Sequence, residues 1–421
     1  MIDIFTEPLR YEFIQRALIA SIAIGVSCGL IGTYIMLRRM SLIGDALAHS
    51  VLPGVVIAFM VSGKSEIALF FGALIAGVVS SVLISFVQRN SKIKEDTSIG
   101  IIFTGAFALG ILLVSQLKQV HIDLSSYLFG DVLGVSNGDI ILSGSITILI
   151  ILSVILFYKQ LLVTSFDPVM AKIIGISTGA VHYFLMTLLS MSIVSGLQSV
   201  GVILIIAMLI TPPATAFLLT DKLKRLLLYS ALFGVLSAIT GLYLSYYFNW
   251  TSGSSIVLVA VFLFALAFLF SPKEGIVMKY IKRKKTKKLN SSEDIVTLVY
   301  KYGDTKNAEE LKEMLTSETG ISSSKVNGII TELMRRGCIT RTNGHLELTN
   351  EGKEMAIKLI RSHRLWETYI TEKNIVTEDN IHEDAHKYEH LLDEDLTDEL
   401  DKELGHPEKD PHGSPIPKKK S

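Results

Sequence analysis

The sequence predicts an all-α, polytopic membrane helical bundle of about nine spans, followed by a smaller soluble part that is mainly helical. Two observations lead to this prediction. Residues 13–270 are mostly apolar with few charges, whereas residues 273–421 are rich in Lys, Glu, Asp and His. The zero formal net charge of the 421-residue chain is an average over these two unlike parts. It therefore gives no information about binding partners.

The predicted spans are apolar runs long enough to cross the hydrocarbon core of a bilayer. Their approximate limits are 13–36, 46–61, 67–87, 98–116, 139–158, 181–197, 199–219, 226–247 and 253–270. Basic residues gather in alternate connections, including Arg38, Arg89, Lys159 and Lys222. By the positive-inside rule, the N-terminus is outside and the soluble part is cytoplasmic. We therefore expect a multi-pass protein of the cytoplasmic membrane.

The segment Ser41–Gly54, SLIGDALAHSVLPG, places a carboxylate and an imidazole four residues apart in an apolar run. On a helix, Asp45 and His49 would share one face. Ionisable groups at membrane depth usually mark a transport path, and this oxygen–nitrogen pair suits a divalent transition metal. A capping Asp and a core His are the structural alternative. Glu95 and Asp96 belong either to the same path or to a solvated helix start.

Prolines interrupt two predicted spans. Pro53-Gly54 follows His49 closely, and Pro212-Pro213 lies in the seventh span. Broken helices in a bilayer are tolerated where they line a cavity, which is where transporters bind their substrates. If a helix continues from Arg39, His49 would lie roughly 15 Å deep.

A short helix is predicted in the inside loop 166–175. Asp167 is suited to the N-cap and Pro168 to the first helical position. Ala171 and Gly175 would leave the helix a small, smooth face that fits a groove of another subunit. An ordinary amphipathic loop helix explains the same residues equally well.

These motifs together resemble the membrane-permease family of zinc-, manganese- and iron-importing ABC transporters, over residues 10–272. The matching stretches are SLIGDALAHSVLPG, EDTSIGIIFTGAFALG, YLFGDVLG, FDPVMAKIIGI and VGVILIIAMLITPPATAFLLTD. The resemblance implies that Asp45 and His49 take part in metal passage and that the segment from Asp167 to Gly175 meets a cytoplasmic ATPase. It also implies an extracytoplasmic solute-binding protein and a second permease chain.

A nucleotide-binding loop is not expected in this chain. The nearest candidate, Gly63-Lys64-Ser65, has Ala58 where a phosphate loop has its first glycine. We therefore predict that this chain is not an enzyme, binds no nucleotide and depends on a separate subunit for ATP hydrolysis.

The soluble part begins with a basic linker, 273–290, which suits contact with anionic lipid. Helices are expected from Ser291 with Ser292 as cap, over AEELKEML, over 321–337 and from Asn350, with a β-hairpin at 338–349. This order is typical of a winged helix, here 291–362. Ser323, Lys325 and Asn327 would face a DNA groove, although such modules also bind proteins.

Metal ligands are predicted in residues 363–421, as a metal-binding and dimerisation domain with a tail. His363 and Glu367 are four residues apart, and His382, His386, Glu389 and His390 follow at helical spacing. Plain polar residues on a solvated helix are the alternative. Residues 291–417 resemble the diphtheria toxin repressor family of metal-dependent regulators. The resemblance implies one site of His363, Glu367 and His382, and another of His386, Glu389, His390 and Asp294.

The sequence thus predicts the permease subunit of a divalent-metal ABC importer with a metal-sensing tail. Because the predicted ligands include no sulfur, Mn²⁺ is favoured, with Fe²⁺ and Zn²⁺ as alternatives. The other hypotheses are a membrane-tethered, metal-responsive transcription regulator that binds DNA, and an ion-driven secondary carrier.

Overall fold

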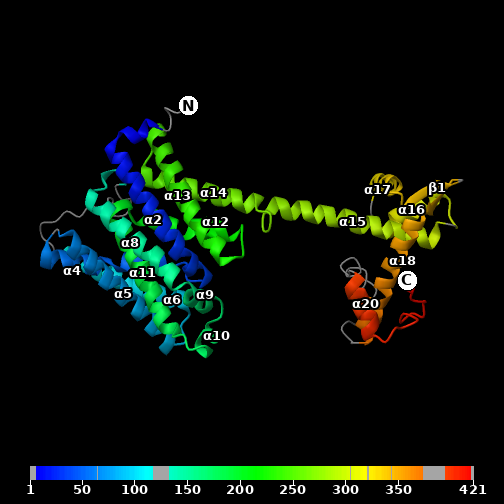
Figure 1. Ribbon diagram of the computed structural model, residues 1–421, viewed down its shortest axis with the longest axis horizontal. Coiled ribbons are helices and arrows are strands. Elements are labelled where there is room, and N and C mark those ends of the chain that lie inside the picture. Colours follow the sequence, from blue (N-terminus) through cyan, green and yellow to red (C-terminus); the bar gives the residue numbers. More distant parts are fainter. Residues whose placement is uncertain are drawn as a thin grey trace. The chain divides into compact units, whose positions relative to one another are not determined.

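A computed structural model describes residues 6–63, 65–116, 132–303, 305–319, 322–342, 344–372 and 394–418. The chain forms two compact units, Met1–Lys279 and Tyr280–Ser421 (Figure 1).

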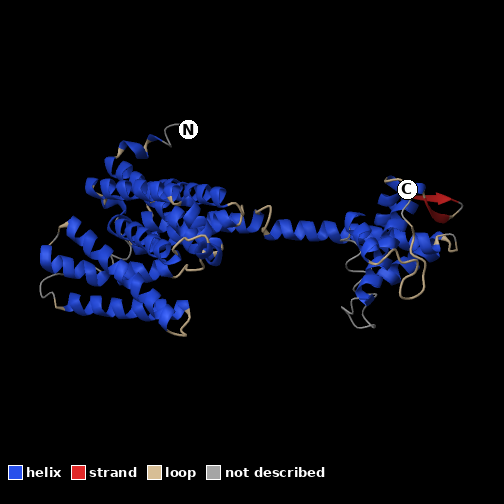
Figure 2. Cartoon of the chain, turned by 60° about the horizontal axis from the view of Figure 1, so that its bottom comes forward, coloured by secondary structure: helices blue, strands red, loops and turns tan. Residues whose placement is uncertain are grey.

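The first unit is entirely helical over its described residues (Figure 2). Its elements are η1 Pro8–Arg10, α2 Glu12–Leu37, α3 Ile43–Ser50, α4 Leu52–Ser62, α5 Glu66–Asn90, α6 Glu95–Ser115, η2 Val132–Gly134, α8 Asn137–Leu156, α9 Tyr158–Phe166, α10 Pro168–Ile173, α11 Thr178–Val200, α12 Val202–Phe217, α13 Leu223–Phe248 and α14 Ser252–Phe270. Among the described residues, eight helical segments are long and apolar enough to cross a membrane, with α3 and α4 counted as one, and α12 is a shorter apolar helix. The predicted polytopic bundle is confirmed.

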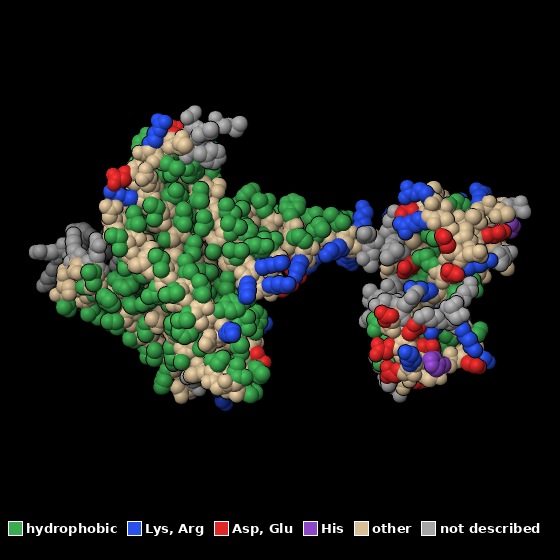
Figure 3. All heavy atoms as spheres, viewed as in Figure 1, with side chains coloured by type: hydrophobic (Ala, Val, Ile, Leu, Met, Phe, Trp, Pro, Cys, Tyr) green, Lys and Arg blue, Asp and Glu red, His purple; other side chains and the backbone are tan. Residues whose placement is uncertain are grey.

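Helix α2 packs closely on α13, and two positions of α2 at this contact, Gly25 and Gly29, have no room for a side chain (Figure 1). A Cβ atom at Gly25 would lie 2.9 Å from the carbonyl carbon of Gly234, and one at Gly29 would lie 2.8 Å from the oxygen of Ser230. Small residues of this kind permit helices to approach within a membrane. Hydrophobic side chains are spread over the visible face of this unit, and few charged side chains appear among them, as contact with lipid requires (Figure 3).

Two local expectations for the spans are wrong. The helix does not continue from Arg39, because this residue has a φ of 61° and α3 begins only at Ile43. His49 therefore lies six residues, roughly 9 Å, along its helix instead of 15 Å. The second error concerns Pro212 and Pro213, which lie inside α12 without ending it, while the chain is interrupted earlier, at Gly201 with a φ of 85°.

The second unit contains the predicted helix–turn–helix and wing. Its elements are α15 Ile276–Tyr302, which begins in the first unit, α16 Ala308–Thr319, α17 Ser323–Arg335, β1 Ile339–Thr342, β2 His345–Leu348, α18 Asn350–Glu372 and α20 Glu394–Glu403. Strands β1 and β2 pair antiparallel, with Ile339 opposite Leu348 (Figure 2). The predicted helix start at Ser292 is wrong, because α15 already includes the basic segment.

Candidate metal sites

Helix α3 brings Asp45 and His49 together, as the spacing predicts. Oδ1 of Asp45 lies 3.6 Å from Nε2 of His49, and the two side chains are 49% and 18% exposed. Two ligands at right angles on one ion, each about 2.1 Å from it, would be about 3 Å apart. A small rotation of either side chain would therefore allow both to bind the same ion.

The wall around His49 is aromatic and closely packed. The imidazole ring lies 5.6 Å from the ring of Phe103 and 5.4 Å from that of Phe107, both on α6. On another side, a Cβ at Gly44 would lie 2.3 Å from a methyl carbon of Leu209 on α12. Helix α3 is thus packed against both α6 and α12, and the two aromatic contacts hold the His49 ring in place.

The open side of Asp45 is the informative feature of this pair. A half-exposed carboxylate in a membrane-spanning segment cannot face lipid without a large free-energy penalty. Because Asp45 is the third residue of the candidate span Ile43–Ser62, the exposed side of its carboxylate faces water, at the end of the span or along an aqueous route, or the surface of another protein chain.

Glu95 and Asp96 lie at the start of α6. Both are in the first turn of the helix, where the N-terminal dipole favours acidic side chains. Glu95 precedes Phe103 by eight residues, or about 12 Å along the axis. Asp96 is exposed, as a solvated helix start requires, whereas Oε1 of Glu95 is buried with no hydrogen-bond partner among the described residues.

The short helix in the loop after α9 begins as predicted. Oδ1 of Asp167 accepts hydrogen bonds from the backbone N–H groups of Val169, at 3.0 Å, and Met170, at 2.8 Å. Pro168 occupies the first helical position. The exposed face of this helix differs from the prediction, because Ala171, which was predicted to form part of it, is fully buried. Gly175 follows the helix with a φ of 83°, and the exposed face is apolar, formed by Val169, Met170, Ile173 and Ile174.

In the second unit, α18 pairs His363 with Glu367. Nε2 of His363 lies 3.2 Å from Oε1 of Glu367, and the side chains are 17% and 3% exposed. A carboxylate so deeply buried needs a cationic or hydrogen-bonding partner, and it has the chemistry of a metal ligand. Asp294, on α15, is partly buried.

The remaining predicted ligands, His382, His386, Glu389 and His390, lie outside the described residues. Within the described part of the chain, no group of three or more His, Cys, Asp or Glu side chains is arranged to hold a metal ion. The predicted DNA contacts Ser323, Lys325 and Asn327 are all exposed at the start of α17.

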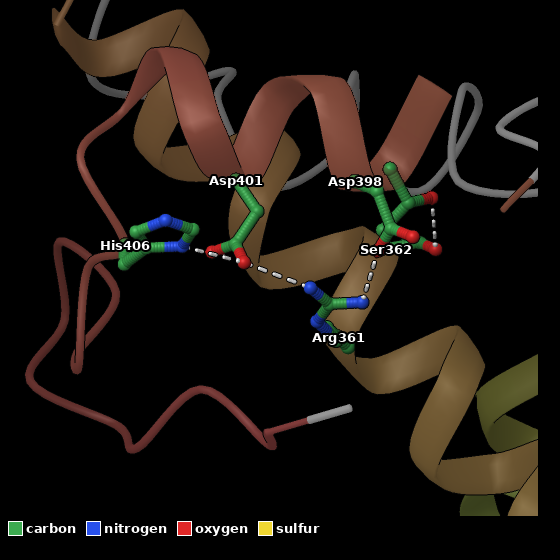
Figure 4. A network of polar contacts seen from close by, with 6 residues as sticks. Arg361, Ser362, Asp398, Asp401 and His406 are labelled. Carbon is green, nitrogen blue, oxygen red and sulfur yellow. Dashed lines mark hydrogen bonds and ion pairs between the residues drawn. The ribbon is translucent and has the colours of Figure 1, made fainter. Parts of the chain in front are cut away.

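A polar network between α18 and α20 was not predicted from the sequence (Figure 4). Arg361 donates to Asp398 and to Asp401, both at 2.9 Å, and Asp401 also meets Nδ1 of His406 at 3.0 Å. The three-residue spacing of Asp398 and Asp401 indicates a shared helix face, but nothing in the sequence identifies Arg361 as their partner. This network fixes α20 on the helix that carries His363 and Glu367.

Comparison with known proteins places the membrane unit in a family. Residues 10–271 match the family model described as the ABC 3 transport family. The chain belongs to this family. Residues 349–418 match a second model, described as the iron dependent repressor, metal binding and dimerisation domain.

Individual relatives match over the first two thirds of the chain. The manganese transport system membrane protein MntC of Halalkalibacterium halodurans is 49% identical over 288 residues, which is 68% of this chain and 97% of the relative. The manganese import system permease protein ScaB of Streptococcus gordonii is 45% identical, over 68% of this chain and 99% of its own. The solved structure of PsaBC from Streptococcus pneumoniae in complex with Fab is 41% identical, with a TM-score of 0.60 over 68% of this chain and all of that chain. These matches and the eight apolar segments identify a multi-pass membrane protein.

Proposed function

We propose that this chain is the permease subunit of an ABC importer that carries a divalent transition metal, foremost Mn²⁺, across the cytoplasmic membrane. The observation that carries the proposal is the Asp45–His49 pair on α3. A carboxylate oxygen and an imidazole nitrogen suit Mn²⁺, Fe²⁺ or Zn²⁺. The names of the relatives from H. halodurans and S. gordonii support Mn²⁺.

In this proposal, Asp45 supplies the negative charge that attracts the ion, and His49 supplies a neutral nitrogen ligand. Phe103 and Phe107 hold the imidazole ring and exclude water from that side of it. The exposed side of Asp45 faces a second permease chain, so that the two α3 helices line one passage. Such a site binds the ion well enough to strip part of its water shell and weakly enough to release it.

Energy comes from a separate cytoplasmic ATPase that contacts the α10 segment. Asp167 and Pro168 fix the start of this helix, and its exposed apolar face provides the contact. The buried Ala171 and the turn at Gly175 shape the segment from within. An extracytoplasmic solute-binding protein delivers the ion. The positive-inside pattern supports a cytoplasmic position for the second unit, and the basic part of α15 suits anionic lipid.

The second unit acts as a cytoplasmic metal sensor that restrains transport. Its proposed parts are the basic linker 273–290, the winged-helix domain 291–362 and the metal-binding and dimerisation domain from 363. Its two proposed sites are formed by His363, Glu367 and His382, and by Asp294, His386, Glu389 and His390. The buried Glu367 carboxylate beside His363 supports the first site.

Radiometal uptake tests the transport proposal. Cells that carry the matching ATPase and solute-binding protein would express the wild type, Asp45→Ala, His49→Ala or the control Glu12→Gln, which changes an exposed carboxylate at the start of α2. We expect ⁵⁴Mn²⁺ uptake to disappear only with the two α3 variants. Uptake that persists without either side chain would overturn the site, and uptake that persists without the ATPase would indicate a secondary carrier. A wild type that shows no uptake and binds DNA would favour the regulator hypothesis.

A further inference from the structure

Arg38 connects the end of α2 to the helix that precedes α10. Its Nη2 group donates to Oγ1 of Thr164 at 2.9 Å, and its Nε group lies 3.3 Å from Oγ of Ser165, both on α9. Ser165 precedes Asp167, the cap of α10, by only two residues. Arg38 is therefore connected to the start of α10 through the end of α9 and the non-helical junction at Asp167.

The other side of Arg38 leads to the proposed metal pair. Arg38 caps α2, and the turn that follows is held by hydrogen bonds from the backbone N–H of Met40 to the oxygen of Ile35, at 3.0 Å, and from that of Ile43 to the oxygen of Met40, also 3.0 Å. Met40 and Ile43 are both buried. These hydrogen bonds and buried side chains leave the turn little freedom of its own, so it forms a stiff connection from Arg38 to α3 and to Asp45, seven residues further along the chain.

A cavity beside Arg38 provides space in which its side chain can move. Its volume is about 230 Å³, and Arg38, Thr164, Pro168 and His182 are among the residues that line it. None of the described lining residues is acidic. Because the partners of Arg38 are neutral hydroxyl groups, their hydrogen bonds can break and re-form without leaving a buried carboxylate unpaired. An ion pair in the same place would resist such a change more strongly.

We propose that Arg38 is a positioning residue that couples the ATPase-contacting segment to the metal-carrying helix α3. When α9 and α10 move, the Arg38–Thr164–Ser165 contact pulls on the turn before α3 and changes the orientation of Asp45 and His49. Arg38 acts through α3 and does not bind the ion. The inference rests on the proposed function, since α10 must be the segment that meets the ATPase.

The test separates coupling from metal binding and from a general effect of charge. Arg38→Leu removes the contact from one side, and Thr164→Val with Ser165→Ala removes it from the other. The matched control is Arg39→Gln, which removes the neighbouring, exposed positive charge. Each variant would be purified with its ATPase, reconstituted into vesicles and supplied with the matching solute-binding protein. The readouts are Mn²⁺ binding, ATP hydrolysis and Mn²⁺ transported per ATP hydrolysed.

We expect both contact variants to bind Mn²⁺ within about twofold of the wild type and to retain ATP hydrolysis. Mn²⁺ transported per ATP should fall at least about tenfold, the scale for loss of a hydrogen bond to a charged group. Arg39→Gln should keep the wild-type ratio, and Arg38→Lys should give an intermediate one, because lysine keeps the charge but lacks the rigid fork with which the guanidinium contacts both hydroxyl groups.

The proposal is overturned if the ratio stays normal in the Thr164/Ser165 variant, which preserves Arg38 and its charge. It is also overturned if Arg39→Gln lowers the ratio equally, because the charge alone would then matter. Loss of transport in Asp45→Ala together with a normal ratio in the contact variants would refute this inference and leave the proposed function intact. Uptake that does not need Asp45 would instead refute the proposed function.

Discussion

The two units of this chain each carry a carboxylate and an imidazole one helical turn apart, and the two pairs differ in burial. Asp45 and His49 are 3.6 Å apart, and the Asp45 side chain is 49% exposed. His363 and Glu367 are 3.2 Å apart, and the Glu367 side chain is 3% exposed. The carboxylate of the pair is therefore half exposed in the membrane unit and buried in the second unit.

This difference fits two different uses of a metal ion. An ion in transit must enter and leave quickly, so its ligands need an open side and a moderate affinity. A sensor must remain occupied long enough to change the structure of its domain, and a buried carboxylate binds a cation more strongly because the local dielectric is low. Four changes to the chain test or sharpen this comparison.

The largest effect is expected from Asp45→Asn, which keeps the size of the side chain and removes its charge. Uptake of ⁵⁴Mn²⁺ should fall by more than about 100-fold, because loss of an outer-shell partner alone already costs metal sites 10–100-fold. Membrane insertion should be normal, since a half-exposed side chain contributes little to packing. Uptake within tenfold of the wild type would show that the Asp45 carboxylate is not a ligand on the metal path.

A smaller effect, confined to metal-replete cells, is expected from Glu367→Gln. Uptake at low internal Mn²⁺ should match the wild type, whereas uptake at high internal Mn²⁺ should rise about threefold or more as the sensor loses a ligand. The matched control is Glu372→Gln, which changes an exposed residue of the same helix. Equal uptake by both variants at every metal concentration would show that this pair does not regulate transport.

The network in Figure 4 should affect local stability. Arg361→Ala leaves Asp398 and Asp401 without their shared donor, and should lower the stability of α20 by about 2 kcal/mol. Faster amide hydrogen exchange in residues 394–403 of the full chain measures this change. Arg336→Ala, which breaks an exposed pair with Glu332, should cost less than about 0.5 kcal/mol. Similar exchange in both variants would contradict a structural role for the Arg361 network.

The smallest effect is expected at the start of α17. Replacing Ser323, Lys325 and Asn327 together by Ala changes exposed side chains and should leave ⁵⁴Mn²⁺ uptake within about twofold of the wild type. If the second unit worked chiefly as a DNA-bound regulator, the variant would instead lose DNA binding and alter transcription of a reporter.

Sequence patterns predicted most elements because their signals are local. The β-hairpin predicted at 338–349 is formed by β1 and β2, and Asp167-Pro168 predicted the start of α10. The basic segment is predicted as a linker, but Lys and Arg favour helix and no Gly or Pro follows Gly275 within it, so α15 runs from Ile276 through its remaining residues. Pro212 is predicted to interrupt a span, yet it lies inside α12, against which α2 and α13 pack.

The candidate sites were predictable only where both partners lie on one helix. The i, i+4 spacing identified Asp45 with His49 and His363 with Glu367. Arg38 was recognised only as part of the positive-inside pattern, because its partner Thr164 is 126 residues away in sequence. Arg361 and its acidic partners were missed for the same reason. Contacts between distant segments depend on packing, which a single sequence does not display.

The most direct test of the account is a structure of the assembled transporter with Mn²⁺, with anomalous scattering used to locate the ion. The account predicts a manganese peak in the membrane unit within about 2.0–2.6 Å of an Asp45 oxygen and a His49 nitrogen, the range for divalent cations in proteins. A manganese peak elsewhere in the membrane unit, with both side chains directed away from it, would contradict the account.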